Sequence, residues 1–241
     1  MNLKCKIGPC DNHAMGLTTL LLPGMHGTSR LFDRLLRVLP DGLTPRVISY
    51  PTDEVLGYDE LLERIEIPNE PFAIVAESYS GPIAIRLAAR GPANLRGLVL
   101  VASFARSPRP MIPRWATGFV WPWLFNIPLP QVGLRRFLLG DDAPPEQIAE
   151  ICEEQRRCRP EVSAARVRDV LTVDVRDDLR RITVPILYLV GRRDRVVPPR
   201  VVRELKRLRP DIEVVVLDSP HAVLQRRPAE AAAAIGRFLL E

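Results

Sequence analysis

Six short runs of apolar residues, each bounded by turn-forming residues, constrain the fold of this chain more than any other feature. Within each run the apolar residues follow one another without alternating with polar ones. This is typical of strands that are buried on both faces of a parallel sheet. Helical patterns separate the runs, so the sequence predicts an α/β fold with a doubly wound, mostly parallel sheet. The expected strands are 17–22, 46–49, 72–76, 98–102, 186–190 and 213–217, and the expected helices are 29–39, 59–65, 81–90, 146–157, 199–208 and 228–240.

The alternation of strands and helices breaks between residues 103 and 178. This segment has no strand-like run, and it contains nine of the 24 prolines and all three tryptophans. Because it lies between two expected strands, we interpret it as an insertion that is helical. We therefore predict a core formed by residues 1–102 and 179–241, and an inserted helical cap formed by residues 103–178.

Length and composition exclude several classes of protein. The 241 residues, of which 46% are hydrophobic, suit one globular domain with a sizeable core. No apolar run reaches the roughly 18 residues of a spanning helix, and the N-terminus lacks the apolar region of a signal peptide. We therefore expect a cytoplasmic protein without stable membrane insertion. The net charge of +5 is interpreted as a solvated surface; no nucleic-acid motif accompanies it, and nucleic acid is not an expected partner.

The sharpest motif is the stretch A-E-S-Y-S-G, which has Ser78 as its third residue. A buried strand meets a helix there, as in a nucleophile elbow, where a strained turn projects a serine hydroxyl above the sheet edge. The usual pattern is G-x-S-x-G, and Ala76 and Ser80 replace its glycines here. Both are small, so strand and helix can still approach closely. The alternative interpretation is that Ser78 is an ordinary N-cap of the following helix.

A serine nucleophile needs a base, and the base needs an orienting carboxylate. The chain has only three histidines, and among them His221 directly follows an expected strand, while Asp194 follows the strand before it. Because the carboxyl ends of parallel strands meet at one edge of the sheet, we expect Ser78, Asp194 and His221 to converge there. Taken singly, Asp194 also suits a turn and His221 suits a helix-capping loop.

Several other residues compete for these roles. Asp218 lies three residues before His221 and is the second candidate for the acid. His26 competes as a base or side-chain donor, but no carboxylate at a strand end accompanies it, so we favour a positioning role. We expect His13 to be structural or mobile. Three further acids precede a strand and should lie at the opposite edge of the sheet: Asp174, Asp177 and Asp178.

Acyl transfer also needs backbone amides that stabilise the negative charge on the carbonyl oxygen. We expect one amide from Tyr79, the residue after the nucleophile, and the other from Met25, in the loop after the first strand. Glu77 is expected to pair with an arginine rather than to line the site. The sequence has no metal-binding cluster and no nucleotide-binding glycine loop, so we expect no metal and no cofactor. The four cysteines have no CxxC spacing and are expected to be free thiols.

From about residue 16 to residue 240 the chain resembles the α/β-hydrolase superfamily. DVRDDLRRITVPILYLVGRRDRVVP (174–198) is similar to the segment that leads from the cap into the acid-bearing strand of that superfamily. SPHAVLQRRPAE (219–230) is similar to its histidine loop and final helix. LLPGMHGTSRLF (21–32) is similar to its oxyanion loop, with Pro23 where many members have histidine.

The resemblance implies the α/β-hydrolase fold, in which the second strand lies outermost with the first inside it, and a cap over the site. Only about 16 residues precede the first core strand, so one or both of the usual leading strands should be short or missing. The chain looks most similar to small carboxylesterases, including the type that cleaves a methyl ester from an acyl chain on a carrier protein. Arginines that could contact an acidic acyl carrier protein in this way are Arg135, Arg136, Arg156, Arg157 and Arg159.

The resulting hypothesis is a serine carboxylesterase that acts on small-molecule acyl esters through an acyl-enzyme intermediate. Acyl thioesterase, lactonase, acyltransferase and carrier-protein methyl-ester esterase use the same residues and remain alternatives. A non-catalytic binding protein with a hydrolase fold is the alternative from a different class. The apolar acyl pocket is expected to use side chains of the cap, which also suit packing inside the cap: Trp115, Phe119, Trp121, Trp123, Leu124, Phe125 and Phe137.

Overall fold

The computed structural model describes residues 16–127 and 131–241 of the chain. Their strands form one six-stranded sheet in the order β2-β1-β3-β4-β5-β6, and every neighbouring pair is parallel. This confirms the predicted parallel sheet, with the second strand outermost and the first inside it. The expectation about leading strands concerns residues outside the described ones. The strands are β1 (Leu17–Leu22), β2 (Leu43–Val47), β3 (Phe72–Glu77), β4 (Leu95–Val101), β5 (Ile186–Gly191) and β6 (Glu213–Leu217).

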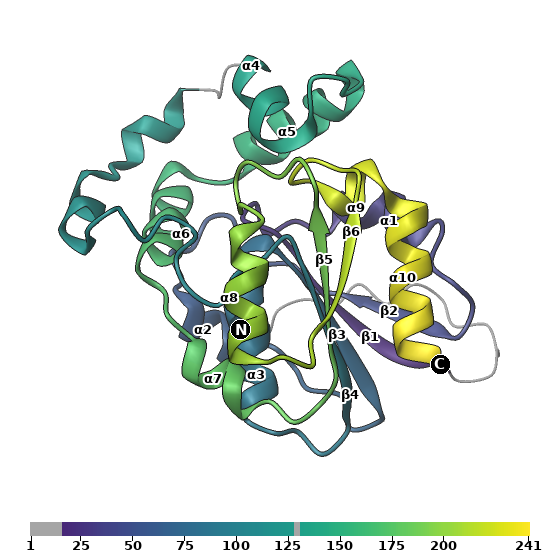
Figure 1. The fold of residues 1–241 in the computed structure, drawn as a ribbon. Coiled ribbons are helices and arrows are strands. Elements are labelled where there is room, and N and C mark those ends of the chain that lie inside the picture. The colour runs from purple at the N-terminus through teal and green to yellow at the C-terminus, as the bar shows by residue number, and fades with distance from the viewer. Residues whose placement is uncertain (1–15, 128–130) are drawn as a thin grey trace.

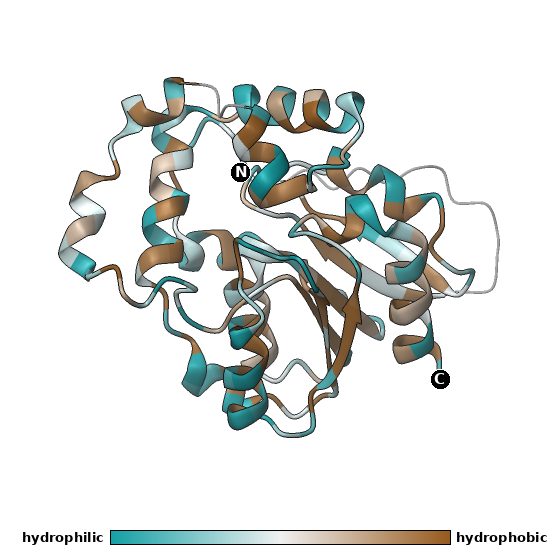
Figure 2. Ribbon diagram, turned by 45° about the horizontal axis from the view of Figure 1, so that its top comes forward, coloured by the Kyte–Doolittle hydropathy of each residue, from teal (hydrophilic) through white to brown (hydrophobic). Residues whose placement is uncertain are grey.

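Helices cover both faces of the sheet (Figure 1). On one face, the buried residues of the strands pack against α2 (Tyr58–Glu63), α3 (Gly81–Ala89), α7 (Arg176–Arg181) and α8 (Arg200–Leu208). On the other face they pack against α1 (Asp33–Leu36), α9 (Val223–Arg226) and α10 (Pro228–Leu240). Figure 2 shows hydrophobic strands between helices that contain both hydrophobic and hydrophilic residues. Burial on both sides explains why the central strands are apolar at successive positions.

Two elements near the N-terminus differ from the prediction. Strand β2 begins at Leu43 and contains Pro45, whereas the predicted strand begins after this proline. Because β2 is an edge strand that pairs only with β1, the missing N–H of Pro45 costs no hydrogen bond within the sheet. The predicted helix 29–39 is a single 3₁₀ turn, Arg30–Phe32, followed by α1, which ends at Leu36.

The segment between β4 and β5 consists of helices joined by loops, and among the described residues it contains one isolated β-bridge. Arg106 and Asp174 form this antiparallel bridge, which joins the two ends of the segment where it leaves and rejoins the sheet. The segment contains two 3₁₀ helices (Arg114–Phe119 and Pro122–Asn126), α4 (Gln131–Leu134), a π-helical turn (Arg135–Leu139), α5 (Pro145–Arg157), α6 (Pro160–Thr172) and α7. In Figure 1, α4 and α5 lie above the loops that follow β5 and β6. The predicted division into a core and a cap of residues 103–178 stays a prediction.

Candidate active site

Ser78 follows β3 in a strained backbone conformation. Its φ angle is 47°, in the left-handed region that non-glycine residues rarely adopt. Helix α3 begins three residues later, and a Cβ atom at Gly81 would lie 1.7 Å from the Ser103 Oγ atom. The Ser103 hydroxyl donates a 2.7 Å hydrogen bond to the Ser78 carbonyl. The sharp turn therefore depends on the close approach of α3 to the residue that follows β4.

The two residues that replace glycines in the motif have clear positions. Ala76 is fully buried in β3. The Ser80 hydroxyl donates a hydrogen bond to the Pro23 carbonyl and accepts one of 2.7 Å from the Tyr50 hydroxyl. A glycine at position 80 would lack both hydrogen bonds. Ser80 thus connects the turn after β3 with the loop after β1.

A chain of hydrogen bonds joins three side chains at the carboxyl edge of the sheet. The Ser78 Oγ atom lies 2.9 Å from His221 Nε2, and His221 Nδ1 lies 2.8 Å from Asp194 Oδ2. Because a carboxylate only accepts hydrogen bonds, the Nδ1 nitrogen carries the proton and Nε2 is left to accept from Ser78. The other oxygen, Asp194 Oδ1, accepts 2.8 Å hydrogen bonds from the amides of Val196 and Val197. Asp194 and His221 are both buried, at 4% and 6% exposure.

The rival acids do not reach His221. Asp218 is an exposed residue whose carboxylate pairs with Arg193 and Arg227. Asp174 pairs with Arg176. Asp177 and Asp178 pair with the arginines three residues further along α7.

Electrostatics at His221 favour its protonated form. Burial by itself lowers the pKa of His221. The charge of Asp194, its hydrogen bond to the ring and the charge of Glu77 act in the opposite direction and leave the pKa above the ordinary 6.5. The imidazole is therefore a stronger base than a free histidine.

Glu77 is buried beside the nucleophile and is not paired with an arginine, which corrects the prediction. Its carboxylate accepts a 3.0 Å hydrogen bond from Gln225 Nε2 and another from the Gly24 amide. Burial raises the pKa of Glu77, and these hydrogen bonds act against that increase. This arrangement could not be predicted from the sequence, because Gln225 lies 148 positions away.

The loop after β1, which contains Met25, is held by a buried arginine from α6. Arg166 donates 2.7 Å hydrogen bonds to the carbonyls of Met25 and Pro51, and it is 1% exposed. Gly27 has a φ angle of 74°, and a Cβ atom there would lie 2.8 Å from Arg166 Nη1. The guanidinium therefore fits tightly against this loop.

The same helix holds the other residue that we expect to provide an oxyanion amide. The Tyr79 hydroxyl donates a 3.0 Å hydrogen bond to Asp169, one helical turn after Arg166. The Tyr79 ring stacks on Tyr58, with 4.7 Å between the ring centroids. Burial raises the pKa of Asp169 to about 6. Sequence reasoning missed both residues of α6, because charged side chains on a helix normally face solvent.

His26 lies at the cavity, whereas His13 lies outside the described residues. Burial and the positive charge of Arg166 lower the pKa of His26 to about 4, so the ring is neutral at neutral pH. His26 lines the same cavity as Ser78 and His221. A neutral ring at this place can donate or accept a hydrogen bond, but it provides no positive charge.

A cavity of about 250 Å³ opens onto Ser78. Two of the seven predicted pocket residues, Leu124 and Phe125, line it, together with Met25 and Tyr79. The remaining apolar lining comes from other parts of the chain, which were not predicted: Leu31, Phe104, Pro108, Ile127, Leu138, Ile151, Val170, Val196 and Ala222.

The other five predicted pocket residues do not line this cavity and are exposed by 46–73%: Trp115, Phe119, Trp121, Trp123 and Phe137. Four of them belong to residues 115–123, in or next to the two 3₁₀ helices. These short helices place the aromatic rings against one another instead of against the sheet. Periodicity could not predict this, because 3₁₀ turns do not repeat with the period of an α-helix.

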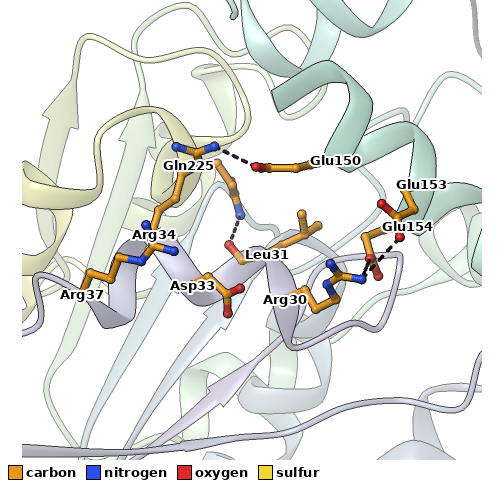
Figure 3. A pocket seen from close by; sticks show the side chains of 9 residues that line it. All are labelled: Arg30, Leu31, Asp33, Arg34, Arg37, Glu150, Glu153, Glu154 and Gln225. Carbon is orange, nitrogen blue, oxygen red and sulfur yellow. Dashed lines mark hydrogen bonds and ion pairs between the residues drawn. The ribbon is translucent and has the colours of Figure 1, made fainter. Parts of the chain in front are cut away.

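A second, polar cavity of about 150 Å³ lies where α1 and the 3₁₀ turn before it meet α5 (Figure 3). Arg30 pairs with Glu153 and Glu154, and Arg34 pairs with Glu150 at 2.9 Å. Gln225 lines both cavities. These ion pairs connect the inserted segment with the core; those of Glu150 and Glu153 are exposed and contribute little to stability, whereas Glu154 is buried.

The part of the chain that the structure describes has no cluster of three or more histidine, cysteine or acidic residues that could hold a metal ion. Within the same residues, no helix is both long enough and apolar enough to cross a membrane. Cys152 and Cys158 are free thiols. Cys5 and Cys10 lie outside the described residues.

With this geometry in view, the chain can be compared with known proteins. The model of the alpha/beta hydrolase family matches residues 17–234. Because the match extends over most of the chain, the protein belongs to the alpha/beta hydrolase family. This confirms the resemblance seen in the sequence and places the chain among hydrolases.

Individual proteins are similar over much of the same region. The chain is 28% identical to a pimeloyl-[acyl-carrier protein] methyl ester esterase of Neisseria meningitidis over 243 aligned residues, covering 92% of this chain and 76% of the relative. It is 29% identical to an N-formylmaleamate deformylase of Pseudomonas putida, covering 62% and 56% of the two chains. Among solved structures, the enol-lactonase of Burkholderia xenovorans has a TM-score of 0.78 at 18% identity, with 96% and 94% coverage. This last likeness shows the fold alone.

Proposed function

We propose that this protein is a serine hydrolase that cleaves carboxylic esters with Ser78, His221 and Asp194 as its catalytic triad. The observation that carries the proposal is the hydrogen-bonded chain from Ser78 Oγ through the His221 ring to Asp194, combined with the left-handed backbone of Ser78. A strained serine at this edge of the sheet, next to a buried base, is the arrangement that acyl transfer requires.

The mechanism follows from the polarity of these hydrogen bonds. Ser78 attacks the ester carbonyl while Nε2 of His221 accepts its proton, and His221 then protonates the leaving alcohol. Asp194 keeps the Nδ1 proton in place and stabilises the imidazolium. Water, activated by His221, attacks the acyl-enzyme and releases the acid.

The amides of Met25 and Tyr79 are the proposed donors to the oxyanion. Arg166 binds the Met25 carbonyl and Asp169 binds the Tyr79 hydroxyl, so α6 contacts both residues. We assign Arg166 a positioning role: it acts through the loop after β1 and does not itself touch the reacting atoms. Fixed amides cost no reorganisation when charge develops on the carbonyl oxygen.

The apolar cavity at Ser78 supports an acyl ester as substrate, with the acyl group among Phe104, Leu124 and Leu138. The relatives named as methyl ester esterases of a carrier-bound acyl group support the narrower proposal that the substrate is a methyl ester on an acyl carrier protein. Of the arginines expected at such a carrier, four are exposed: Arg136, Arg156, Arg157 and Arg159. Arg157 and Arg159 also pair with glutamates, and the partly buried Arg135 binds backbone carbonyls. Residues 103–178 are proposed to act as the cap of this site.

Labelling with a fluorophosphonate probe tests the reaction class. We expect the wild type to be labelled at Ser78, Ser78→Ala to be unlabelled, and the control Ser29→Ala to be labelled as the wild type. A wild-type protein that binds acyl esters but is not labelled would instead be the non-catalytic binding protein.

The substrate class is then tested with p-nitrophenyl esters and thioesters of equal chain length, and with carrier-bound methyl esters. Faster turnover of the thioesters would contradict the ester assignment.

A further inference from the structure

The segment between β4 and β5 consists of two halves with opposite charge. Residues 103–139 contain five arginines and no acidic residue, whereas residues 140–178 contain six arginines and eleven acidic residues. All three tryptophans belong to the basic half. The near-zero charge of the whole segment therefore conceals a basic, aromatic half.

The basic half presents a continuous apolar surface to solvent. We call it the aromatic surface, and it consists of Met111, Trp115, Phe119, Trp121, Trp123 and Ile127, which are 48–89% exposed. The four aromatic rings follow one another with centroids 6.1–6.2 Å apart. In Figure 1 this teal stretch before α4 stands away from the sheet, on the far side of α6. Soluble proteins rarely expose a contiguous apolar patch of this kind unless it binds something.

Two arginines lie close in the sequence to residues of the aromatic surface, and one of them, Arg114, also lines a polar cavity with Asp59, Glu60, Asp169 and Asp174. Arg109 and Arg114 are exposed, and their guanidinium groups donate hydrogen bonds to the backbone carbonyls of Arg195 and Thr172. A carbonyl partner leaves the full positive charge in place. The tryptophan indole N–H groups have no hydrogen-bond partner among the described residues, so they can donate to a bound molecule.

The aromatic surface is continuous with the cavity at Ser78. Leu124, Phe125 and Ile127 line that cavity, and Ile127 is also part of the aromatic surface. The 3₁₀ helix Pro122–Asn126 exposes Trp123 to solvent and directs Phe125 into the cavity. The 3₁₀ helix Pro122–Asn126 thus links an apolar chain bound at the surface with the cavity that contains the nucleophile.

We propose that the aromatic surface binds the interface of an anionic lipid bilayer. Exposed indole rings, with an apolar body and a polar N–H, favour the boundary between acyl chains and headgroups. Arginines beside them are attracted to anionic headgroups. The exposed residues of this surface are aromatic and aliphatic, which suits a lipid interface better than an acidic protein, whose carboxylates would need arginines among the contacting residues. The binding is peripheral and needs no spanning helix.

Binding to vesicles tests this inference. We expect the wild type to co-sediment with phosphatidylcholine–phosphatidylglycerol vesicles at least about tenfold more than with phosphatidylcholine alone. The double variant Trp121→Ala/Trp123→Ala should lose this binding, and Arg109→Gln/Arg114→Gln should weaken it. The matched controls, Leu240→Ala for an exposed apolar residue and Arg203→Gln/Arg207→Gln for the same change of charge, should bind as the wild type.

A second measurement, made on the wild type, does not depend on whether the variants fold. Tryptophan fluorescence of the folded wild type should shift to the blue when anionic vesicles are added, with circular dichroism unchanged. Absence of vesicle binding, equal loss in the control variants, or Trp121-dependent binding to an acidic acyl carrier protein but not to vesicles would overturn the inference. The role of the surface in substrate delivery rests on the proposed function, but vesicle binding does not. Ser78→Ala should therefore bind vesicles normally even though it is inactive.

Discussion

The carboxyl edge of the sheet and the segment between β4 and β5 both line the cavity at Ser78, but they are built differently. The edge residues are held by buried strands and by hydrogen bonds, as for Asp194, which accepts two backbone amides. The inserted segment supplies ten of the 21 residues that line the cavity, most of them apolar, but it leaves its tryptophans exposed to solvent. The difference supports the proposal that the edge holds Ser78, His221 and Asp194 in place for catalysis, while the insertion determines which substrate reaches them.

Separate replacement of the two candidate acids, Asp194 and Asp218, should give the largest difference in activity. Asp194→Asn should lower kcat/KM about 10³–10⁴-fold, because the His221 ring loses the carboxylate that fixes its tautomer. Asp218→Asn should change kcat/KM less than about twofold, since exposed pairs with arginine contribute little. Steady-state kinetics with a soluble p-nitrophenyl ester measures both, and a large loss in Asp218→Asn alone would reverse the assignment.

Arg166 is the point at which the inserted segment acts on the edge. Arg166→Met should lower kcat about 10–100-fold with little change in KM for a short ester. The loop that contains Met25 is then no longer fixed by a hydrogen bond, while the lining of the cavity stays the same. Arg166→Lys should recover only part of the rate, since an ammonium group cannot replace the planar guanidinium at two carbonyls. Arg168→Met on the same helix is the matched control, because Arg168 binds only the Val120 carbonyl within the inserted segment. If KM rises and kcat does not fall, Arg166 shapes the cavity and does not position the loop.

The pH dependence of the reaction reports the charges around His221. His221 must be neutral to accept the Ser78 proton, so kcat/KM should fall as the pH falls through the His221 pKa, which lies above 6.5. The charge of Glu77 is one cause of the raised pKa of His221, so Glu77→Gln should move the acid limb of the pH profile to lower pH. Glu66→Gln, which changes an exposed carboxylate of the same size, should leave the limb in place. A limb that moves to higher pH in Glu77→Gln would contradict the direction of this coupling.

The smallest effect concerns stability at the contact between α6 and Tyr79. The pKa of Asp169 is raised to about 6, so the folded protein binds this proton more tightly than the unfolded chain. Charging Asp169 therefore destabilises the fold above that pKa, and the penalty disappears as the pH falls below it. Asp169→Asn keeps an oxygen that accepts from Tyr79 and should raise Tm by about 2–4 °C near pH 8, with a smaller gain near pH 5. A gain that is equal at both pH values would have another origin.

The positions of the three proposed catalytic residues could be predicted because each of them follows a strand. Buried strands are recognisable as short apolar runs, and parallel strands bring their carboxyl ends to one edge, so the convergence of Ser78, Asp194 and His221 needed no further information. The start of β2 was predicted too late because a proline is tolerated only in an edge strand. The sequence alone does not show that β2 lies at the edge, since this depends on the order of the strands in the sheet. The exposure of Trp121 and Trp123 was not predictable for a related reason: an apolar side chain on a short, irregular helix does not reveal which way it faces.

By itself, the sequence determined the parallel sheet, the positions of Ser78, Asp194 and His221 at the ends of strands, and the helical nature of the insertion. These features depend on local patterns of apolar residues and turns. Only the tertiary structure decided which charged groups are buried. Arg166 and Glu77 look like surface residues in the sequence, yet each is held by partners more than 100 positions away. Burial of a charge is stable only when distant groups supply its hydrogen bonds, and such partners become neighbours only in the folded chain.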